Sequence, residues 1–297
     1  MAQAVPINAD EFIEQQLDIR IAYIQRITEA DCIAIWGPLF YGVDNIVRDE
    51  IEQLKKQGKR QKLVVVLTTP GGSVEVAQRI AETLRHHYAV IEFIVPNSAF
   101  SAGTVLVMSG DAIYMDYYSR LGPIDPQVPT KEGKLVPALG YLEKYNALIE
   151  KAKEGKLTPA EVHLLVTGFN QAELYQYEQA RALSVALLKE WLVKYKFKDW
   201  TVTESRKIPV TLEMKEMRAT EIADALNKIE RWHSHGRGIS RAVLEKELNL
   251  RINDLDAHNN ASLNKAIKNY HHLLVDYMSK RRTSGVVHRR GAYEPFM

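Results

Sequence analysis

The sequence has a single cysteine in 297 residues, so it cannot contain an internal disulfide. Cys32 lies in the apolar run 32–36, which indicates a buried strand, and a lone buried thiol favours a reducing compartment. No apolar run approaches the roughly 20 residues that a membrane-spanning helix needs. The polar start, residues 1–15, also lacks the apolar core of a signal peptide. We therefore expect a cytoplasmic protein without an integral membrane segment.

Other absences limit the possible partners and cofactors. With 39 basic and 37 acidic residues the net charge is only +2, which gives no reason to expect a nucleic-acid partner. The sequence contains neither a Gly-x-Gly-x-x-Gly dinucleotide turn nor an ATP-binding loop of the Gly-x-x-x-x-Gly-Lys-Ser/Thr type. His233 and His235 have no cysteine or acidic companion nearby, so we assign no metal. We expect no cofactor.

A glycine-rich turn joins an apolar strand to an amphipathic helix near residue 70. Residues 63–68 are apolar and β-branched, and Pro70, Gly71 and Gly72 follow them, as in a buried parallel strand that ends at a tight turn. Apolar residues then recur every three or four positions, which predicts a helix capped by Ser73. Glycine lets the backbone approach a ligand closely, and free amides before a helix can bind an oxyanion.

The next strand and helix repeat this arrangement with a serine at the turn. Residues 90–95 predict a second strand, and residues 101–108 predict an apolar helix that opens at Ser101. Ala102 and Gly103 are small, which leaves room for a substrate carbonyl above the Ser101 hydroxyl and frees the Ala102 amide as an oxyanion donor. We therefore expect the two neighbouring turns to share one acyl-transfer site.

Four segments resemble the ClpP/crotonase superfamily of serine peptidases, and most closely the serine dehydrogenase proteinases related to signal peptide peptidase A. The segments are Pro-Gly-Gly at 70–72, Ser-Ala-Phe-Ser-Ala-Gly-Thr at 98–104, Ser-Arg-Leu-Gly-Pro-Ile-Asp-Pro-Gln at 119–127 and Ser-His-Gly-Arg-Gly-Ile at 234–239. The Gly-Pro-Ile-Asp-Pro-Gln run is the most specific. The resemblance implies a stacked βαβ spiral core, a nucleophile at Ser101, and an oxyanion hole formed by the amides of Gly72 and Ala102.

The general base does not carry over with this resemblance. In ClpP-type enzymes a histidine follows the serine by roughly two strands, but residues 119–125 contain none. We favour His235, because a histidine titrates near neutrality, with Asp125 as the partner that would orient it. Signal-peptide-peptidase relatives instead use a lysine from a later helix. The candidates here are Lys144, Lys151, Lys153 and the preceding Lys134. A catalytic lysine must be neutral, which requires its pKa to fall from about 10.4 by roughly three units in a dry pocket.

Each candidate also has a structural explanation, and two other functions stay open. Ser98 or Ser101 could cap the next helix, Asp125 could fix a turn, and His235 could be an ordinary loop residue. The chain could be a ClpP-like scaffold that has lost its base. It could also be a crotonase-type enzyme acting on acyl-CoA thioesters, although that chemistry needs a carboxylate base and an adenine pocket.

Four parts are expected along the chain. Residues 1–30 form an N-terminal helix over 10–29, with Ile13, Leu17, Ile21 and Ile24 on one face. Residues 31–200 form an α/β core with strands near 32–37, 63–68, 90–95 and 111–115, residues 201–280 form a C-terminal helical extension, and residues 281–297 form a basic, disordered tail. The fold class is therefore α/β, with a ClpP/crotonase-like core.

The sequence as a whole predicts a cytoplasmic serine hydrolase, a peptidase that forms an acyl-enzyme at Ser101 with a peptide or protein substrate. The family resemblance also implies a homo-oligomer, because ClpP and its signal-peptide-peptidase relatives assemble rings around their active sites.

Overall fold

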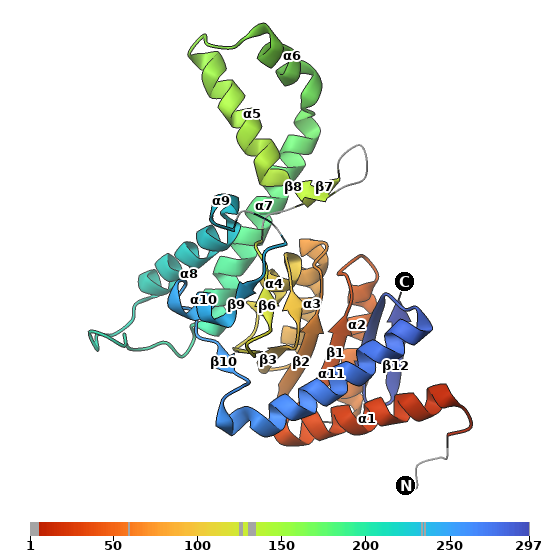
Figure 1. The fold of residues 1–297 in the computed structure, drawn as a ribbon. Coiled ribbons are helices and arrows are strands. Elements are labelled where there is room, and N and C mark those ends of the chain that lie inside the picture. The colour runs from red at the N-terminus through yellow and green to blue at the C-terminus, as the bar shows by residue number, and fades with distance from the viewer. Residues whose placement is uncertain are drawn as a thin grey trace.

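The computed structural model describes residues 6–58, 60–124, 127–129, 135–232, 234 and 236–296. Its centre is a seven-stranded sheet in the order β10-β5-β3-β2-β1-β11-β12 (Figure 1). The strands are β1 Asp31–Trp36, β2 Lys62–Thr68, β3 Val90–Val95, β5 Ala112–Met115, β10 Asn253–Asp254, β11 Gly285–Arg289 and β12 Ala292–Phe296. The first five of these are parallel, while β11 and β12 are antiparallel to their neighbours. The expected α/β class is confirmed.

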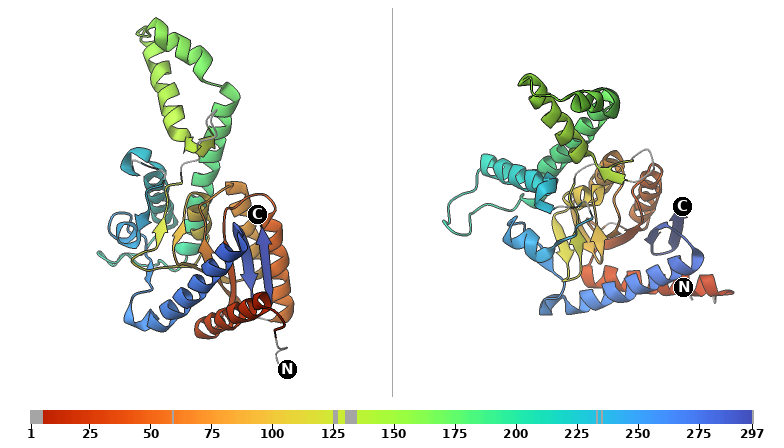
Figure 2. Two further views of the ribbon diagram at one scale, coloured as in Figure 1. Left: turned by 45° about the vertical axis from the view of Figure 1, so that its right-hand side comes forward. Right: turned by 45° about the horizontal axis from the view of Figure 1, so that its top comes forward.

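Helices cover both faces of this sheet (Figure 2). They are α1 Ala9–Thr28, α2 Val43–Gln57, α3 Val74–His87, α4 Ala102–Val107, α5 Ala138–Lys153, α6 Pro159–Gly168, α7 Gln171–Trp191, α8 Leu212–Asn227, α9 Ile229–Trp232, α10 Arg241–Lys246 and α11 Ala261–Arg281. A π-helical turn, Leu192–Lys196, continues α7, and a 3-10 turn, His258–Asn260, precedes α11. The four predicted strands agree with β1, β2, β3 and β5 to within one residue at each end.

The central strands are apolar on both faces because each face has its own core. In β1, Ile33 and Ile35 pack with α2, α3 and α4, whereas Cys32 and Ala34 pack with α1 and α11. Parallel strands covered by helices on both sides show this near-continuous hydrophobic run. Burial also raises the pKa of the Cys32 thiol, so this cysteine is unsuited to act as a nucleophile.

The N-terminal helix forms as the sequence predicts. Asn8 caps α1 by accepting a hydrogen bond from the Glu11 amide, and Leu17, Ile21 and Ile24 are fully buried. The helix runs antiparallel to α11. Arg281 at the end of α11 pairs at 2.6 Å with Asp10 at the start of α1. α1 therefore belongs to the same core as the sheet.

The predicted disordered tail at 281–297 is wrong. Residues 285–296 form the hairpin β11–β12, which extends the sheet beyond β1. Val286 and Val287 are fully buried, and the side chain of Arg289 forms an ion pair with Glu50. His288 is also buried and bonds to the Tyr270 hydroxyl at 2.8 Å. The sequence of this segment does not indicate a strand, because the residues that pair with His288 and Arg289 belong to helices distant in sequence.

A helical arm, made of α5, α6 and the first half of α7, projects from the sheet (Figure 1). A short hairpin of β7 Gln127–Pro129 and β8 Leu135–Pro137 leads into it. The arm has only a small core around Leu142 and Leu174, and no residue of α6 is buried. The second half of α7 packs on the body of the protein through Leu187, Leu188 and Trp191.

Partial burial of His271 on α11 makes stability depend on pH. Burial, and secondarily the neighbouring His272, lower the pKa of His271 to about 4 from its ordinary value of 6.5. Between these values the unfolded chain binds a proton that the folded chain does not, so stability falls as the pH falls from about 6.5 towards 4. The expected loss attributable to His271 is about 2 kcal/mol between neutral pH and pH 5.

Urea unfolding at these two pH values tests this expectation. His271→Gln should reduce the loss of stability on acidification, because the amide does not titrate. His272→Gln is the matched control, since His272 is the adjacent, exposed residue of the same helix. If His271→Gln and His272→Gln showed the pH dependence of the wild type, burial of His271 would not be its cause.

Candidate active site

Ser101 lies in a strained turn between a short strand, β4 Ser98–Ala99, and α4. Its backbone angles are φ 51° and ψ −120°, a conformation that a residue with a side chain rarely adopts. Ser101 occupies the N-cap position of α4, yet its side chain makes no capping hydrogen bond. The structure therefore gives no support to helix capping as the role of this hydroxyl. A strained turn from strand to helix is also how α/β hydrolases expose a nucleophilic serine.

The glycine turn at 70–72 packs directly against the Ser101 turn. A Cβ placed on Gly71 would lie 2.8 Å from the Ser101 Cβ and 2.8 Å from the Phe100 carbonyl oxygen. On the other side, a Cβ on Gly72 would lie 2.3 Å from the Leu39 carbonyl oxygen. Both glycines have positive φ, 104° and 147°. A side chain at either position would prevent the two turns from packing this closely.

Backbone hydrogen bonds hold the two turns in register. Thr69 donates to Ser98 at 2.9 Å and accepts from Phe100 at 3.0 Å. Leu39 donates to Gly71 at 2.8 Å and accepts from Ser73 at 2.9 Å, while the Ser73 side chain caps α3. The Gly72 amide takes part in none of the loop hydrogen bonds of the described residues, and Ala102, as the first residue of α4, has no acceptor within its own helix. These two amides are therefore free to serve as oxyanion donors.

A second sheet, of three strands, brings the family-like segments 119–127 and 234–239 close to the Ser101 turn. Its order is β4-β6-β9, where β6 is Arg120–Leu121 and β9 is Ile239–Ser240. β4 and β6 are parallel and β9 is antiparallel to them. The chain after β4, the chain after β6 and the chain before β9 therefore lie at one end of this sheet. Segments separated by more than 130 positions in the sequence converge beside Ser101.

The buried hydroxyl of Thr104 links the nucleophile turn to β6. It lies 2.7 Å from the Ala99 carbonyl oxygen, 3.0 Å from the Gly122 carbonyl oxygen and 2.9 Å from the Gly122 amide, from which it accepts. Gly122 also packs against the Phe100 ring, where a Cβ would lie 2.5 Å from the nearest ring carbon. The sequence analysis missed this role of Thr104. The only indication in the sequence that Thr104 has a role at the site is its position in the family-like segment 98–104.

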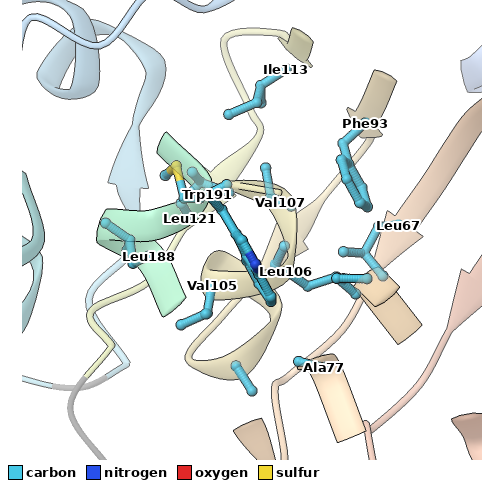
Figure 3. Packing of buried hydrophobic residues seen from close by; sticks show 14 of the residues in the cluster. Leu67, Ala77, Phe93, Val105, Leu106, Val107, Ile113, Leu121, Leu188 and Trp191 are labelled. Carbon is cyan, nitrogen blue, oxygen red and sulfur yellow. The ribbon is translucent and has the colours of Figure 1, made fainter. Parts of the chain in front are cut away.

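Hydrophobic packing holds α4 and therefore the turn that precedes it. Every residue of α4 is buried, and Figure 3 shows Val105, Leu106 and Val107 beside Trp191 of α7. Figure 3 also places Leu121 in this cluster. A rigid support of this kind fixes a reactive group more accurately than a mobile loop does.

The predicted base and its partner lie outside the described residues. Asp125 and His235, and also Lys134, are among the positions that the structure leaves undescribed. Their neighbours are placed: the Ile124 amide donates to Leu226 at 3.1 Å, and Gly238 packs against the side chain of Arg120. Both neighbours flank the end of the β4-β6-β9 sheet that carries Ser101. The roles of His235 and Asp125 stay predictions.

The three described lysine candidates lie on α5, in the projecting arm. Lys144, Lys151 and Lys153 are all exposed. Lys151 pairs with Glu161 at 2.6 Å, and Lys153 pairs with Glu150 at 2.7 Å. Exposure and acidic partners both favour the charged form of an amine. Within this chain, these lysines therefore lack the dry environment that a neutral general base requires.

The described residues contain no group of three or more His, Cys, Asp or Glu side chains placed to hold a metal ion. In the same residues, no helix is both long and apolar enough to cross a membrane.

Comparison with known families gives a match over residues 15–158, to the family described as ClpP-like SDH-type serine proteinase. The predicted resemblance is confirmed. This SDH-type segment contains Gly72, Ser101, Ala102 and the Gly-Pro-Ile-Asp-Pro-Gln run. It also contains all four lysine candidates, whereas His235 lies beyond it.

Two other proteins are similar to parts of this chain. One uncharacterized protein of Methanocaldococcus jannaschii is 34% identical over 107 residues, covering 35% of this chain and 37% of the relative. A second from the same organism is 27% identical over 168 residues, covering 56% of this chain and 54% of the relative. This chain thus spans about half or less of the length of either relative.

Two similar solved structures are of the 1510-N membrane-bound stomatin-specific protease. A serine-to-alanine mutant is 12% identical with a TM-score of 0.45, over 77% of this chain and 80% of the other. A lysine-to-alanine mutant in complex with a substrate peptide is 14% identical with a TM-score of 0.45, over 77% of this chain and 75% of the other.

Proposed function

We propose that this chain is a serine hydrolase, and specifically a peptidase, with Ser101 as its nucleophile. The observation that carries the proposal is the strained, uncapped Ser101 turn, packed against a glycine turn with a free amide. The match of the SDH-type segment to serine proteinases supports the same chemistry.

In this mechanism the Ser101 hydroxyl attacks the carbonyl carbon of the scissile peptide bond while a base takes its proton. The Gly72 and Ala102 amides stabilise the oxyanion of the tetrahedral intermediate. The protonated base then gives its proton to the departing amine, which leaves an ester at Ser101. Water, activated by the same base, hydrolyses the ester and restores the serine.

An exposed aromatic pair offers a contact for the substrate. Phe40 and Tyr41 are 51% and 73% exposed, and they follow Leu39, whose backbone pairs with Gly72. Aromatic side chains beside a catalytic turn provide apolar contact area for a bound peptide. We therefore include a peptide or protein chain as the substrate class.

Two further features complete the proposal. We propose a homo-oligomer, which the family resemblance implies, and a cytoplasmic location, which fits the buried, unpaired thiol of Cys32. Both rest on the sequence analysis and are independent of the chemistry at Ser101.

Reaction of the wild-type protein with a fluorophosphonate probe tests the nucleophile. The expected product carries one adduct, which peptide mapping should place on Ser101 and not on Ser98. Failure of the probe to react at any pH between 6 and 9 would contradict the hydrolase proposal and favour a ClpP-like scaffold.

Alanine substitution of the candidate general bases should identify the residue that activates Ser101. We expect His235→Ala to lower the labelling rate by about 10²–10⁴-fold, because a positioned general base contributes this much. The wild-type rate should rise with pH through about 6.5 and then level off, as for a histidine base. The measurement is the second-order labelling rate from pH 5.5 to 9.

The matched variants are Lys144→Ala, Lys151→Ala and Lys153→Ala, whose rates should equal that of the wild type because these side chains are exposed. A large loss in one lysine variant, with His235→Ala unaffected, would transfer the role of base to that lysine.

A further inference from the structure

The hydroxyl of Thr104 bridges two chain segments beside the nucleophile turn. Thr104 is 0% exposed, and its Oγ1 lies 2.7 Å from the Ala99 carbonyl oxygen and 3.0 Å from the Gly122 carbonyl oxygen. The Gly122 amide donates to the same Oγ1 at 2.9 Å. A hydroxyl can donate one hydrogen bond and accept two. Its single proton therefore serves one carbonyl at a time, and the shorter distance favours Ala99.

Other helical threonines of this chain use their hydroxyls differently. Thr28, Thr167 and Thr220 each donate to the carbonyl oxygen four positions earlier in the same helix. Such bonds stay within one helix and hold no other segment in place. Thr104 instead bonds outside α4, to the end of β4 and to the residue that follows β6. Its hydroxyl therefore joins separate elements of the site.

The bridge lies where the backbone pairing of β4 with β6 ends. The two strands pair over two residues each. Beyond these pairs the chain enters the strained conformation of Ser101, with φ 51° and ψ −120°. A strained backbone persists where its surroundings hold it. The Thr104 hydroxyl extends the contact between the two segments to Gly122, and it restrains the nucleophile turn in addition to the packing of Gly71.

The segment that contains Gly122 is itself fixed to the C-terminal helical part. The Ile124 amide donates to the Leu226 carbonyl oxygen of α8 at 3.1 Å. Ile124 immediately precedes Asp125, the predicted partner of the general base. The Thr104 bridge therefore connects the nucleophile turn to the stretch of chain that leads to this residue.

We propose that Thr104 is a positioning residue for the acyl transfer at Ser101. Its hydroxyl sets the distance between the nucleophile turn and the chain after β6, and so places the Ser101 hydroxyl and the Ala102 amide for attack on the substrate carbonyl. Because Thr104 is fully buried, it cannot contact the substrate and acts on the chemical step, not on substrate binding. A misplacement of about 1 Å at a reacting group can cost about 10²-fold in rate. This inference rests on the proposed peptidase function.

Substitution by valine tests the role of the hydroxyl. Valine has nearly the shape of threonine, but it leaves the Ala99 carbonyl and the Gly122 amide without this partner. Thr104→Val should lower kcat for a fluorogenic peptide and the rate of fluorophosphonate labelling by about 10–100-fold, with KM unchanged. Both rates are referred to the folded fraction, measured by near-UV circular dichroism, so that a loss of stability alone does not lower them.

Thr104→Ser is the conservative variant, because serine keeps the hydroxyl and loses only a methyl group. Its kcat and labelling rate should stay close to those of the wild type. Thr104→Cys supplies a weaker hydrogen-bonding group and should react at an intermediate rate. If Thr104→Val does not fold, the comparison of Thr104→Ser with Thr104→Cys decides the question, and equal rates in these two variants would contradict the proposal.

Ser109→Ala is the matched control from the other end of α4. The Ser109 hydroxyl is equally buried and donates to the Leu106 carbonyl oxygen at 2.6 Å, away from the nucleophile turn. Its loss should lower the unfolding midpoint and leave kcat and the labelling rate unchanged. Wild-type rates in Thr104→Val, a slow Thr104→Ser, or a raised KM with unchanged kcat would each overturn the positioning role. Equal slowing in Ser109→Ala would also overturn it.

The wild type separates this inference from the proposed function. A wild type that hydrolyses peptide and is labelled at Ser101, together with a Thr104→Val that reacts equally fast, would refute only the positioning role. A wild type that neither hydrolyses peptide nor reacts with the probe would refute the peptidase, and the role of Thr104 would fall with it.

Discussion

Ser101→Ala is expected to abolish probe labelling and to lower peptide hydrolysis by at least about 10⁴-fold, since no acyl-enzyme can form without the hydroxyl. The fold should be unaffected. Alanine keeps the β-carbon, and the Ser101 side chain makes no capping bond whose loss would weaken α4. The measurements are the hydrolysis rate of a fluorogenic peptide library and the thermal unfolding midpoint of the same sample.

Ser98→Ala is the matched control for this prediction. Ser98 lies three positions earlier, and its backbone carbonyl accepts from Thr69 in both the wild type and the variant. Its activity should therefore equal that of the wild type. If Ser101→Ala retained activity while Ser98→Ala lost it, the nucleophile would be misassigned.

The sequence predicted the centre of the fold well because buried parallel strands carry an unambiguous signal. Residues 63–68 and 90–95 are mostly apolar, with Glu92 as the single charged residue, and a proline follows each within two positions, so their limits agree with β2 and β3 to within one residue. The stripe on α1 was equally clear. In these segments the local pattern and the tertiary environment require the same residues.

Prediction failed where partners are distant in sequence. β11 contains His288 and Arg289, whose burial depends on Tyr270 and Glu50. No periodicity within residues 281–297 indicates such partners, so the basic, aperiodic sequence predicts a tail where the structure has a strand. The projecting arm was not predicted for a similar reason. The apolar stripes of α5 and α7 are those of ordinary helices, and they do not reveal whether a helix packs on the body of the protein or on another helix of the arm.

The candidate site was predictable in part for the same reason. Gly71, Gly72 and Ser101 lie in short motifs that require particular backbone conformations, and the structure shows positive φ at all three. Thr104 could not be found in this way. Its contacts with Ala99 and Gly122 depend on the pairing of β4 with β6, which the sequence does not reveal.

Gly72→Ala is expected to reduce peptide hydrolysis by about 10²–10³-fold, the usual cost of losing one oxyanion donor. The cause is steric. The new Cβ would lie 2.3 Å from the Leu39 carbonyl oxygen, and the φ of 147° disfavours any residue other than glycine. The turn must therefore move, and the Gly72 amide moves with it. The same clash should lower the free energy of unfolding by about 1–3 kcal/mol.

Gly140→Ala separates this effect from a general intolerance of added side chains. Gly140 lies in α5, where a Cβ would meet no atom within 4 Å, so hydrolysis should be unchanged and stability equal or slightly higher. Kinetics and urea unfolding of both variants distinguish the two possible roles of the Gly72 turn. A Gly72→Ala protein that is less stable but fully active would show that the turn only supports the fold. Loss of activity in samples that remain folded would place the Gly72 amide at the reacting carbonyl.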